Sequence, residues 1–210
     1  GTVSDLPTVD GPCRRRRKSP GLANAGDHIA RLRHGIYGGR RSARAPRRRN
    51  YPIMADRKKR LESNAAGQFF VDATCINCDA CRQLAPRTFE EVGDYSAVVR
   101  QPAGEAQMHQ AYQALLACPV GSIGVEHSNS AYMERARASF PLHFEGGVYY
   151  CGFNSEKSFG ANSFFVEHPE GNWLIDSPRY LKQLVEAYER MGGLRFIFLT
   201  HEDDVAAAGR

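Results

Sequence analysis

Long apolar runs are missing from the 210-residue sequence, and no stretch approaches the length that a membrane-spanning helix needs. A membrane span is therefore not predicted. A secretory signal of the usual form is also missing, which argues against a disulfide-stabilised secreted protein. Of the seven histidines, only His201 lies in a pattern typical of metal ligation.

Acidic residues are scarce at the N-terminus. Residues 1–53 hold 13 Lys and Arg against 3 Asp and Glu, whereas residues 54–210 carry a net charge of −5. Nucleic-acid binding is therefore not predicted for the folded part. Residues 1–60 show no sustained periodicity and are predicted to be a disordered basic arm. Specific nucleic-acid binding by the arm, a transit peptide, and translated sequence upstream of Met54 remain alternatives.

The cysteines are few, but half of them cluster within seven residues. The six are Cys13, Cys75, Cys78, Cys81, Cys118 and Cys151. Such clustering is more typical of metal ligation in a reducing compartment than of a disulfide framework. The cytosol and the plastid stroma are the predicted locations, since both are reducing.

The clustered cysteines form the pattern C-x2-C-x2-C, from Cys75 through Cys78 to Cys81, and Cys118-Pro119 follows much later. A cubane cluster has four iron corners, and each needs one deprotonated sulfur. Two residues between ligands let a tight loop reach three corners, while the fourth takes a distant cysteine. No second C-x2-C-x2-C exists, so Cys118 is predicted to complete the same 4Fe-4S cluster.

A zinc site on the same four thiols is the alternative. Structural zinc usually takes two pairs of ligands, and the second pair is missing here. A zinc-binding interaction module therefore stays as the lesser hypothesis.

The residues around the cysteines suggest a small domain of alternating strands and helices. Apolar runs predict strands at 69–72, 97–100 and 123–126, and helical spacing predicts helices at 84–89 and 105–117. With Cys118-Pro119, the segment 66–127 resembles single-cluster ferredoxin domains of the bacterial type. The resemblance implies electron transfer to a redox partner protein, with apolar side chains covering the cluster. The candidates for this cover are Ile76, Leu84, Pro86, Phe89, Val120 and Ile123.

The second half repeats neither the cysteines nor the order of elements. Residues 128–142 are predicted to be a linker or connecting helix. Strands are then expected at 143–151, 163–168, 173–176 and 195–200, with a helix at 180–191. The strand at 195–200 is apolar enough to predict burial on both faces. The whole chain is thus predicted to be an α+β protein.

Residues 160–168, 173–178 and 196–201 resemble the opening strands and the metal-loop strand of the metallo-β-lactamase fold. In that family the loop T-H-x-H-x-D-H holds one or two metal ions. Here His201 matches the first ligand, whereas Asp203 stands where the second His belongs. His201, Asp203 and Asp204 are therefore the candidate ligands of a zinc or iron ion in the partial segment 143–210. A solvated acidic loop is the alternative.

Electron transfer through one 4Fe-4S cluster is the predicted function. A metal-dependent hydrolase or oxidoreductase with an accessory cluster is the alternative. Because the second metal motif is degenerate and stops at Arg210, catalysis is not predicted for this chain, and no catalytic residue is assigned.

Overall fold

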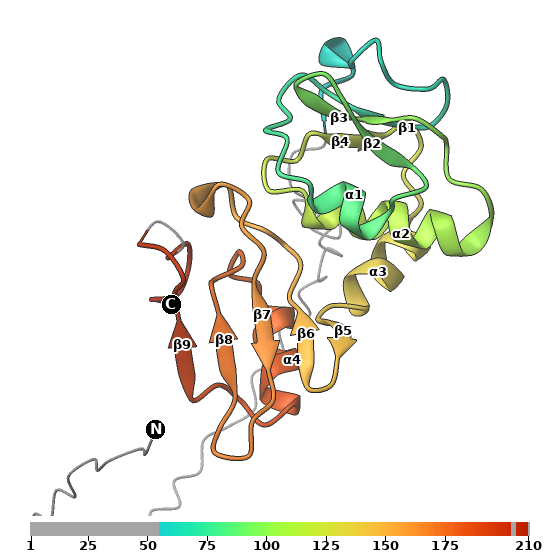
Figure 1. Cartoon of the computed structure of the whole chain (residues 1–210). Helices are drawn as coiled ribbons and strands as arrows, with labels where there is room; N and C mark the ends of the chain where they lie inside the picture. Colours follow the sequence, from blue (N-terminus) through green and yellow to red (C-terminus); the bar gives the residue numbers. More distant parts are fainter. Residues whose placement is uncertain (1–54, 203–204, 210) are drawn as a thin grey trace, which may run out of the picture. The chain divides into compact units, whose positions relative to one another are not determined.

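The computed structural model describes residues 55–202 and 205–209, all of which belong to one compact unit (Figure 1). The first part of this unit contains two helices and four strands. In chain order they are β1 (Phe69–Val71), α1 (Ala80–Leu84), β2 (Phe89–Val92), β3 (Tyr95–Val98), α2 (Gly104–Ala117) and β4 (Ile123–Val125).

The strands of this part form two antiparallel pairs, β1 with β4 and β2 with β3. Helix α2 packs against them because its apolar residues recur at helical spacing, as the sequence predicts. The Tyr112 ring meets the Phe69 ring edge-on at 5.3 Å between centroids. The helix ends at Cys118-Pro119, since the residue before a proline disfavours the helical conformation.

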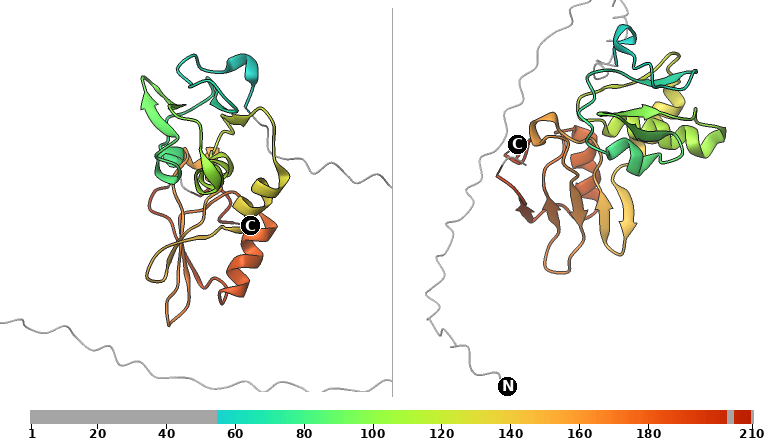
Figure 2. Two further views of the ribbon diagram at one scale, coloured as in Figure 1. Left: turned by 90° about the vertical axis from the view of Figure 1, so that its right-hand side faces the viewer. Right: turned by 45° about the horizontal axis from the view of Figure 1, so that its top comes forward.

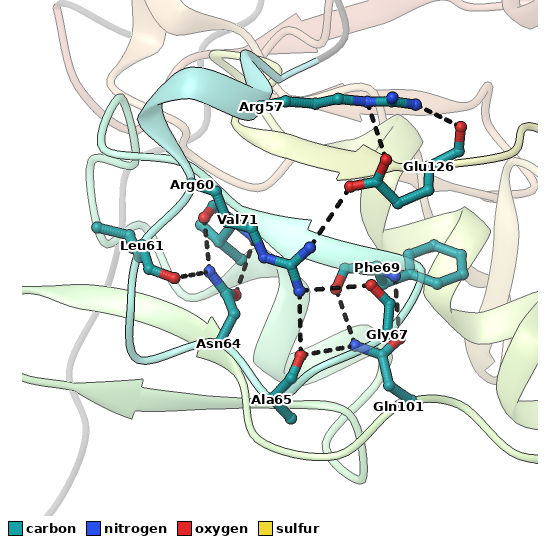
Figure 3. A network of polar contacts seen from close by, with 10 residues as sticks. All are labelled: Arg57, Arg60, Leu61, Asn64, Ala65, Gly67, Phe69, Val71, Gln101 and Glu126. Atoms are coloured by element: carbon teal, nitrogen blue, oxygen red, sulfur yellow. Dashed lines mark hydrogen bonds and ion pairs between the residues drawn. The ribbon is translucent and has the colours of Figure 1, made fainter.

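The predicted basic arm extends too far toward the C-terminus. Residues Arg57–Lys59 form a 3-10 helix, and the Asp56 carboxylate caps it by accepting from the Lys58 N–H. Arg57 and Arg60 pair with Glu126 at 3.0 and 3.4 Å (Figure 3). Residues 55–60 therefore belong to the fold. The sequence does not predict this, because these residues show no local periodicity. Residues 1–54 lie outside the described part of the chain.

Two side-chain amides hold β1 in place beside β3, with which it shares no sheet. Asn64 Oδ1 accepts from the backbone N–H groups of Val71 and Val98, at 2.9 and 3.0 Å. Asn64 Nδ2 donates to the Leu61 and Val71 carbonyls. Gln101 bonds both backbone groups of Phe69 in the same way (Figure 3).

Replacing Asn64 with alanine is expected to destabilise the protein by about 3 kcal/mol, because two backbone donors in the interior lose their acceptor. Chemical denaturation followed by circular dichroism measures the loss. Asn64→Asp retains the accepting oxygen and should cost clearly less. Equal losses for the two variants would show that the acceptor role has been misassigned.

The second part begins with helix α3 (Ser130–Ala138), which lies within the residues predicted to be a linker or connecting helix. Besides the 3-10 helix Glu156–Ser158, five strands and one α-helix follow. They are β5 (Leu142–Glu145), β6 (Val148–Tyr150), β7 (Phe164–Val166), β8 (Trp173–Ile175), α4 (Lys182–Arg190) and β9 (Phe196–Phe198). The strands form one sheet in the order β5-β6-β7-β8-β9, antiparallel except for the parallel pair β8–β9.

Helix α4 lies along one face of this sheet (Figure 2). The Tyr188 ring stacks on the Phe165 ring of β7 at 5.2 Å, and Leu184 and Leu174 belong to the same buried cluster. The mixed helix-and-sheet architecture agrees with the predicted α+β class.

Three predicted elements differ from the structure. The strand expected at 143–151 is a hairpin, since Gly146 and Gly147 turn the chain between β5 and β6. The helix expected at 84–89 lies earlier, at α1. Strand β9 is an edge strand, and its Ile197 and Phe198 are 45% and 53% exposed, so the predicted burial on both faces is wrong.

Within the described residues, no helix has the length and apolar character needed to cross a membrane.

Candidate functional site

The four cysteines of the predicted cluster site line one small cavity in the first part of the unit. Cys75 and Cys78 lie in the loop after β1, Cys81 in the first turn of α1, and Cys118 directly after α2. The space between their side chains is narrow, with a cavity volume of about 10 Å³. Cys81 and Cys118 are buried, whereas Cys75 and Cys78 are partly accessible.

Apolar residues form most of the remaining wall, with two serine hydroxyls among them. These neighbours are Val71, Ile76, Ala80, Ser96, Val120, Ser122 and Ile123. Predicted cover residues Ile76, Val120 and Ile123 are thus present. The predicted Leu84, Pro86 and Phe89 are not part of this wall.

The cysteine loop owes its shape to two residues in the left-handed backbone region. Asn77 has φ 54° and Asp79 has φ 69°. Among residues with a side chain, Asn and Asp tolerate this region best. The Asn77 N–H points to Cys75 Sγ at 3.4 Å, which is the amide-to-sulfur arrangement that stabilises a thiolate bound to iron.

Arg82 holds both left-handed residues in place. Its Nε donates to Asp79 Oδ1 at 2.5 Å, and its Nη1 donates to Asn77 Oδ1. Nη1 also donates to Ser96 Oγ of β3 at 2.8 Å. The guanidinium therefore ties the cysteine loop to the neighbouring hairpin. Sequence reasoning missed this role, although an Asn and an Asp between ligand cysteines signal a left-handed turn.

Replacing Arg82 with methionine is expected to speed the loss of iron in air about tenfold, because residues that orient metal ligands have effects of that size on metal retention. Absorbance decay of the anaerobically purified protein after air exposure measures the rate. Arg87→Met removes an equal charge from an exposed position of the following loop and should leave the rate unchanged. Similar rates for Arg82→Met and wild type would contradict the positioning role.

Burial makes the thiols poor acids before metal binds. It raises the pKa of the Cys81 thiol to about 12, with further increases from Cys118, Cys75 and Cys78. Burial also raises the pKa of Cys78. Both thiols are protonated at neutral pH without metal, so they must release protons when iron binds.

The donor set fits a cubane cluster. Four soft thiols face one cavity, and at least one backbone N–H points at a sulfur. Across residues 55–202 and 205–209, no three His, Cys, Asp or Glu side chains could share a single metal ion.

The second part of the chain reaches the cysteine loop at Gly160. This residue has φ +84°, and a Cβ added to it would lie 2.8 Å from Cys78 Cβ and 3.1 Å from Pro119 Cγ. Its carbonyl accepts from Asn154 Nδ2 at 2.9 Å, and Asn154 is fully buried. Tyr150 OH donates to Asn154 Oδ1 at 2.7 Å. Sequence reasoning missed this contact, because a glycine in a loop can serve many structural purposes and does not by itself indicate a close approach to a distant segment.

Only part of the predicted second metal site can be placed. His201 is exposed and follows β9, whereas Asp203 and Asp204 lie outside the described residues. The preceding Thr200 is held by Asp176, whose two carboxylate oxygens accept from its N–H at 2.7 Å and its hydroxyl at 2.8 Å.

Cys151 is fully buried, as its apolar neighbours predict, and it does not line the cavity of the four cysteines. Burial raises the pKa of its thiol to about 11, so it is no ready nucleophile. Cys13 lies outside the described residues.

Comparison with protein families matches residues 71–125 to the 4Fe-4S single cluster domain of Ferredoxin I. All four cysteines of the cavity fall within the matched residues. The match does not extend to residues 143–210, and nothing in the comparisons supports their metallo-β-lactamase resemblance. The curated proteins and the solved structures gave no match to the chain. The segment 71–125 is thus similar to a single-cluster ferredoxin domain, and the 4Fe-4S cluster is its cofactor.

Proposed function

We propose that the chain carries single electrons on a 4Fe-4S cluster held by Cys75, Cys78, Cys81 and Cys118. One observation carries the proposal: three thiols from one loop and its adjoining helical turn and a fourth from the end of α2 line a single, mostly apolar cavity. Thiolate-bound iron supplies the redox chemistry, and the protein sets its potential through burial and hydrogen bonds.

The chain's own residues have distinct tasks in this function. Buried Val71 and Ile123 exclude water from the inner side of the site. Ile76 lines the same cavity but is 46% exposed, in the loop that carries the accessible Cys75 and Cys78. The tip of the cysteine loop is therefore where a redox partner protein would approach most closely. The five described cysteines are free thiols, which suits the reducing compartment proposed for the protein.

Reversible reduction tests the proposal. The anaerobic protein should show broad visible absorption that dithionite bleaches, with a one-electron paramagnetic signal in the reduced form. Mild reoxidation should restore the absorption over repeated cycles without loss of iron. A cluster that cannot be reduced, or that breaks down in the first cycle, would refute the electron-carrier function while leaving cluster binding intact.

A zinc-binding interaction module is the alternative use of the same thiols. Zinc would need the four sulfurs drawn tightly around one ion, at about 2.3 Å each. Metal analysis separates the two, because a zinc module would contain one zinc and no acid-labile sulfide.

Metal-dependent hydrolysis or redox chemistry in residues 143–210 is the second candidate function. The observation that favours it is the buried Asp176 carboxylate, which fixes Thr200 beside His201 at the carboxyl ends of β8 and β9. These two hydrogen bonds would position His201 as a ligand at the start of a metal loop. A zinc or iron ion in excess of the cluster, lost in His201→Ala, would support this candidate.

A further inference from the structure

Arg179 lies at the junction between the two parts of the chain, after β8. Its Nη2 donates to the Leu116 carbonyl at 2.6 Å, in the last turn of the helix that ends at Cys118. Its Nε donates to the Phe153 carbonyl at 3.4 Å, and the guanidinium lies 6.0 Å from the centre of the Phe153 ring. A residue of the second part thereby places a positive charge on the backbone two residues before Cys118, a predicted cluster ligand.

This guanidinium has no carboxylate partner among the described residues, since none of the ion pairs there includes it. The charged or titratable groups that face it are Cys118, Tyr150 and Arg137. Burial lowers the pKa of Arg179, and the Cys118 thiolate acts in the opposite direction. A cation in a partly buried site needs a compensating negative charge, because desolvation is costly.

A 4Fe-4S cluster supplies that charge. Four thiolates give the bound cluster a net negative charge, and reduction adds one more electron. A fixed cation nearby therefore stabilises the reduced form more than the oxidised form, which raises the reduction potential. The effect grows as screening by water and salt falls, and the Arg179 guanidinium is partly buried, 6.0 Å from the centre of the Phe153 ring.

We propose that Arg179 is a built-in counter-ion of the cluster, through which residues 143–210 raise the reduction potential of the ferredoxin-like segment. This inference rests on the proposed cluster ligands, Cys118 above all. It gives the second part of the chain a task that requires no second metal ion. Arg179 acts on the cluster only through the electrostatic effect of its charge and makes no bond to iron.

The test compares three variants with wild type by anaerobic potentiometric titration, followed through the paramagnetic signal of the reduced cluster. Arg179→Gln is expected to reduce the equilibrium constant for reduction about tenfold, which corresponds to a potential about 59 mV more negative. Arg179→Lys retains the charge and should recover more than half of the difference. Lys182→Gln removes an equal charge that is paired with Glu186 at the surface, and should leave the potential unchanged.

The outcomes separate a role of the Arg179 charge from a role in packing. A full cluster with an unchanged potential in Arg179→Gln overturns the proposal, and so does an equal shift in Lys182→Gln. If Arg179→Gln fails to load a cluster while Arg179→Lys loads one of wild-type potential, the charge itself is required and the proposal stands. Failure of both variants assigns Arg179 a packing role and overturns it. Iron and sulfide missing from wild type would instead refute the proposed cluster function.

Discussion

Replacing Cys118 with serine is expected to lower the iron content of the anaerobically purified protein from about four atoms to below about one per chain. Cys118 comes from the end of α2, whereas the other three thiols come from one loop and its adjoining helical turn. Without it, one corner of a cubane lacks a soft ligand in a buried apolar site, and a hydroxyl oxygen binds iron poorly there. Iron and sulfide assays measure the loss.

Cys151→Ser is the matched control, because it makes an identical change at a fully buried cysteine that does not line the site. It should retain the wild-type iron content. Equal iron content in Cys118→Ser and wild type would mean that another ligand completes the cluster, and the assignment of the distant cysteine would be wrong.

Replacing Gly160 with alanine is expected to destabilise the protein by roughly 2–4 kcal/mol and to make the cluster labile. The φ of +84° disfavours any residue with a Cβ, at a cost of about 1 kcal/mol. The new Cβ would also press on Cys78 from 2.8 Å, and overpacking of this kind costs about 1–3 kcal/mol. Thermal unfolding and the rate of absorbance loss in air measure the two effects.

Gly146→Ala separates backbone strain from contact with the site. Gly146 has φ +53°, but a Cβ there would meet nothing within 4 Å. Its variant should lose only about 1 kcal/mol and should keep a stable cluster. If the two alanine variants retain their clusters equally well, the close approach of Gly160 to Cys78 does not matter for cluster stability.

The sequence predicts most of the local structure, because each element has a clear signal of its own. Helix α2 has apolar residues at helical spacing and a Cys-Pro end, and β1 and β4 are short apolar runs. The single strand predicted at 143–151 differs from the observed hairpin, because the apolar residues on both sides of Gly146 and Gly147 hide the turn. Strand β9 was misjudged because its apolar residues predict burial, while its position at the sheet edge is decided by tertiary pairing.

The candidate site likewise has residues that a local sequence pattern predicts and residues that only the tertiary structure reveals. Ligand spacing alone points to Cys75, Cys78, Cys81 and Cys118, since the cluster imposes it on the sequence. Gly160 and Arg179 approach the site only after the chain folds back, and neither residue belongs to a local motif. Their roles depend on contacts between distant parts of the chain, which no periodicity or spacing records.

The central claim is that four thiols hold one cubane cluster, and the most direct test is the iron and acid-labile sulfide content of protein purified without oxygen. We expect about four irons and about four sulfides per chain. A colourless protein that contains zinc, or that stays free of iron after anaerobic reconstitution, would contradict the account.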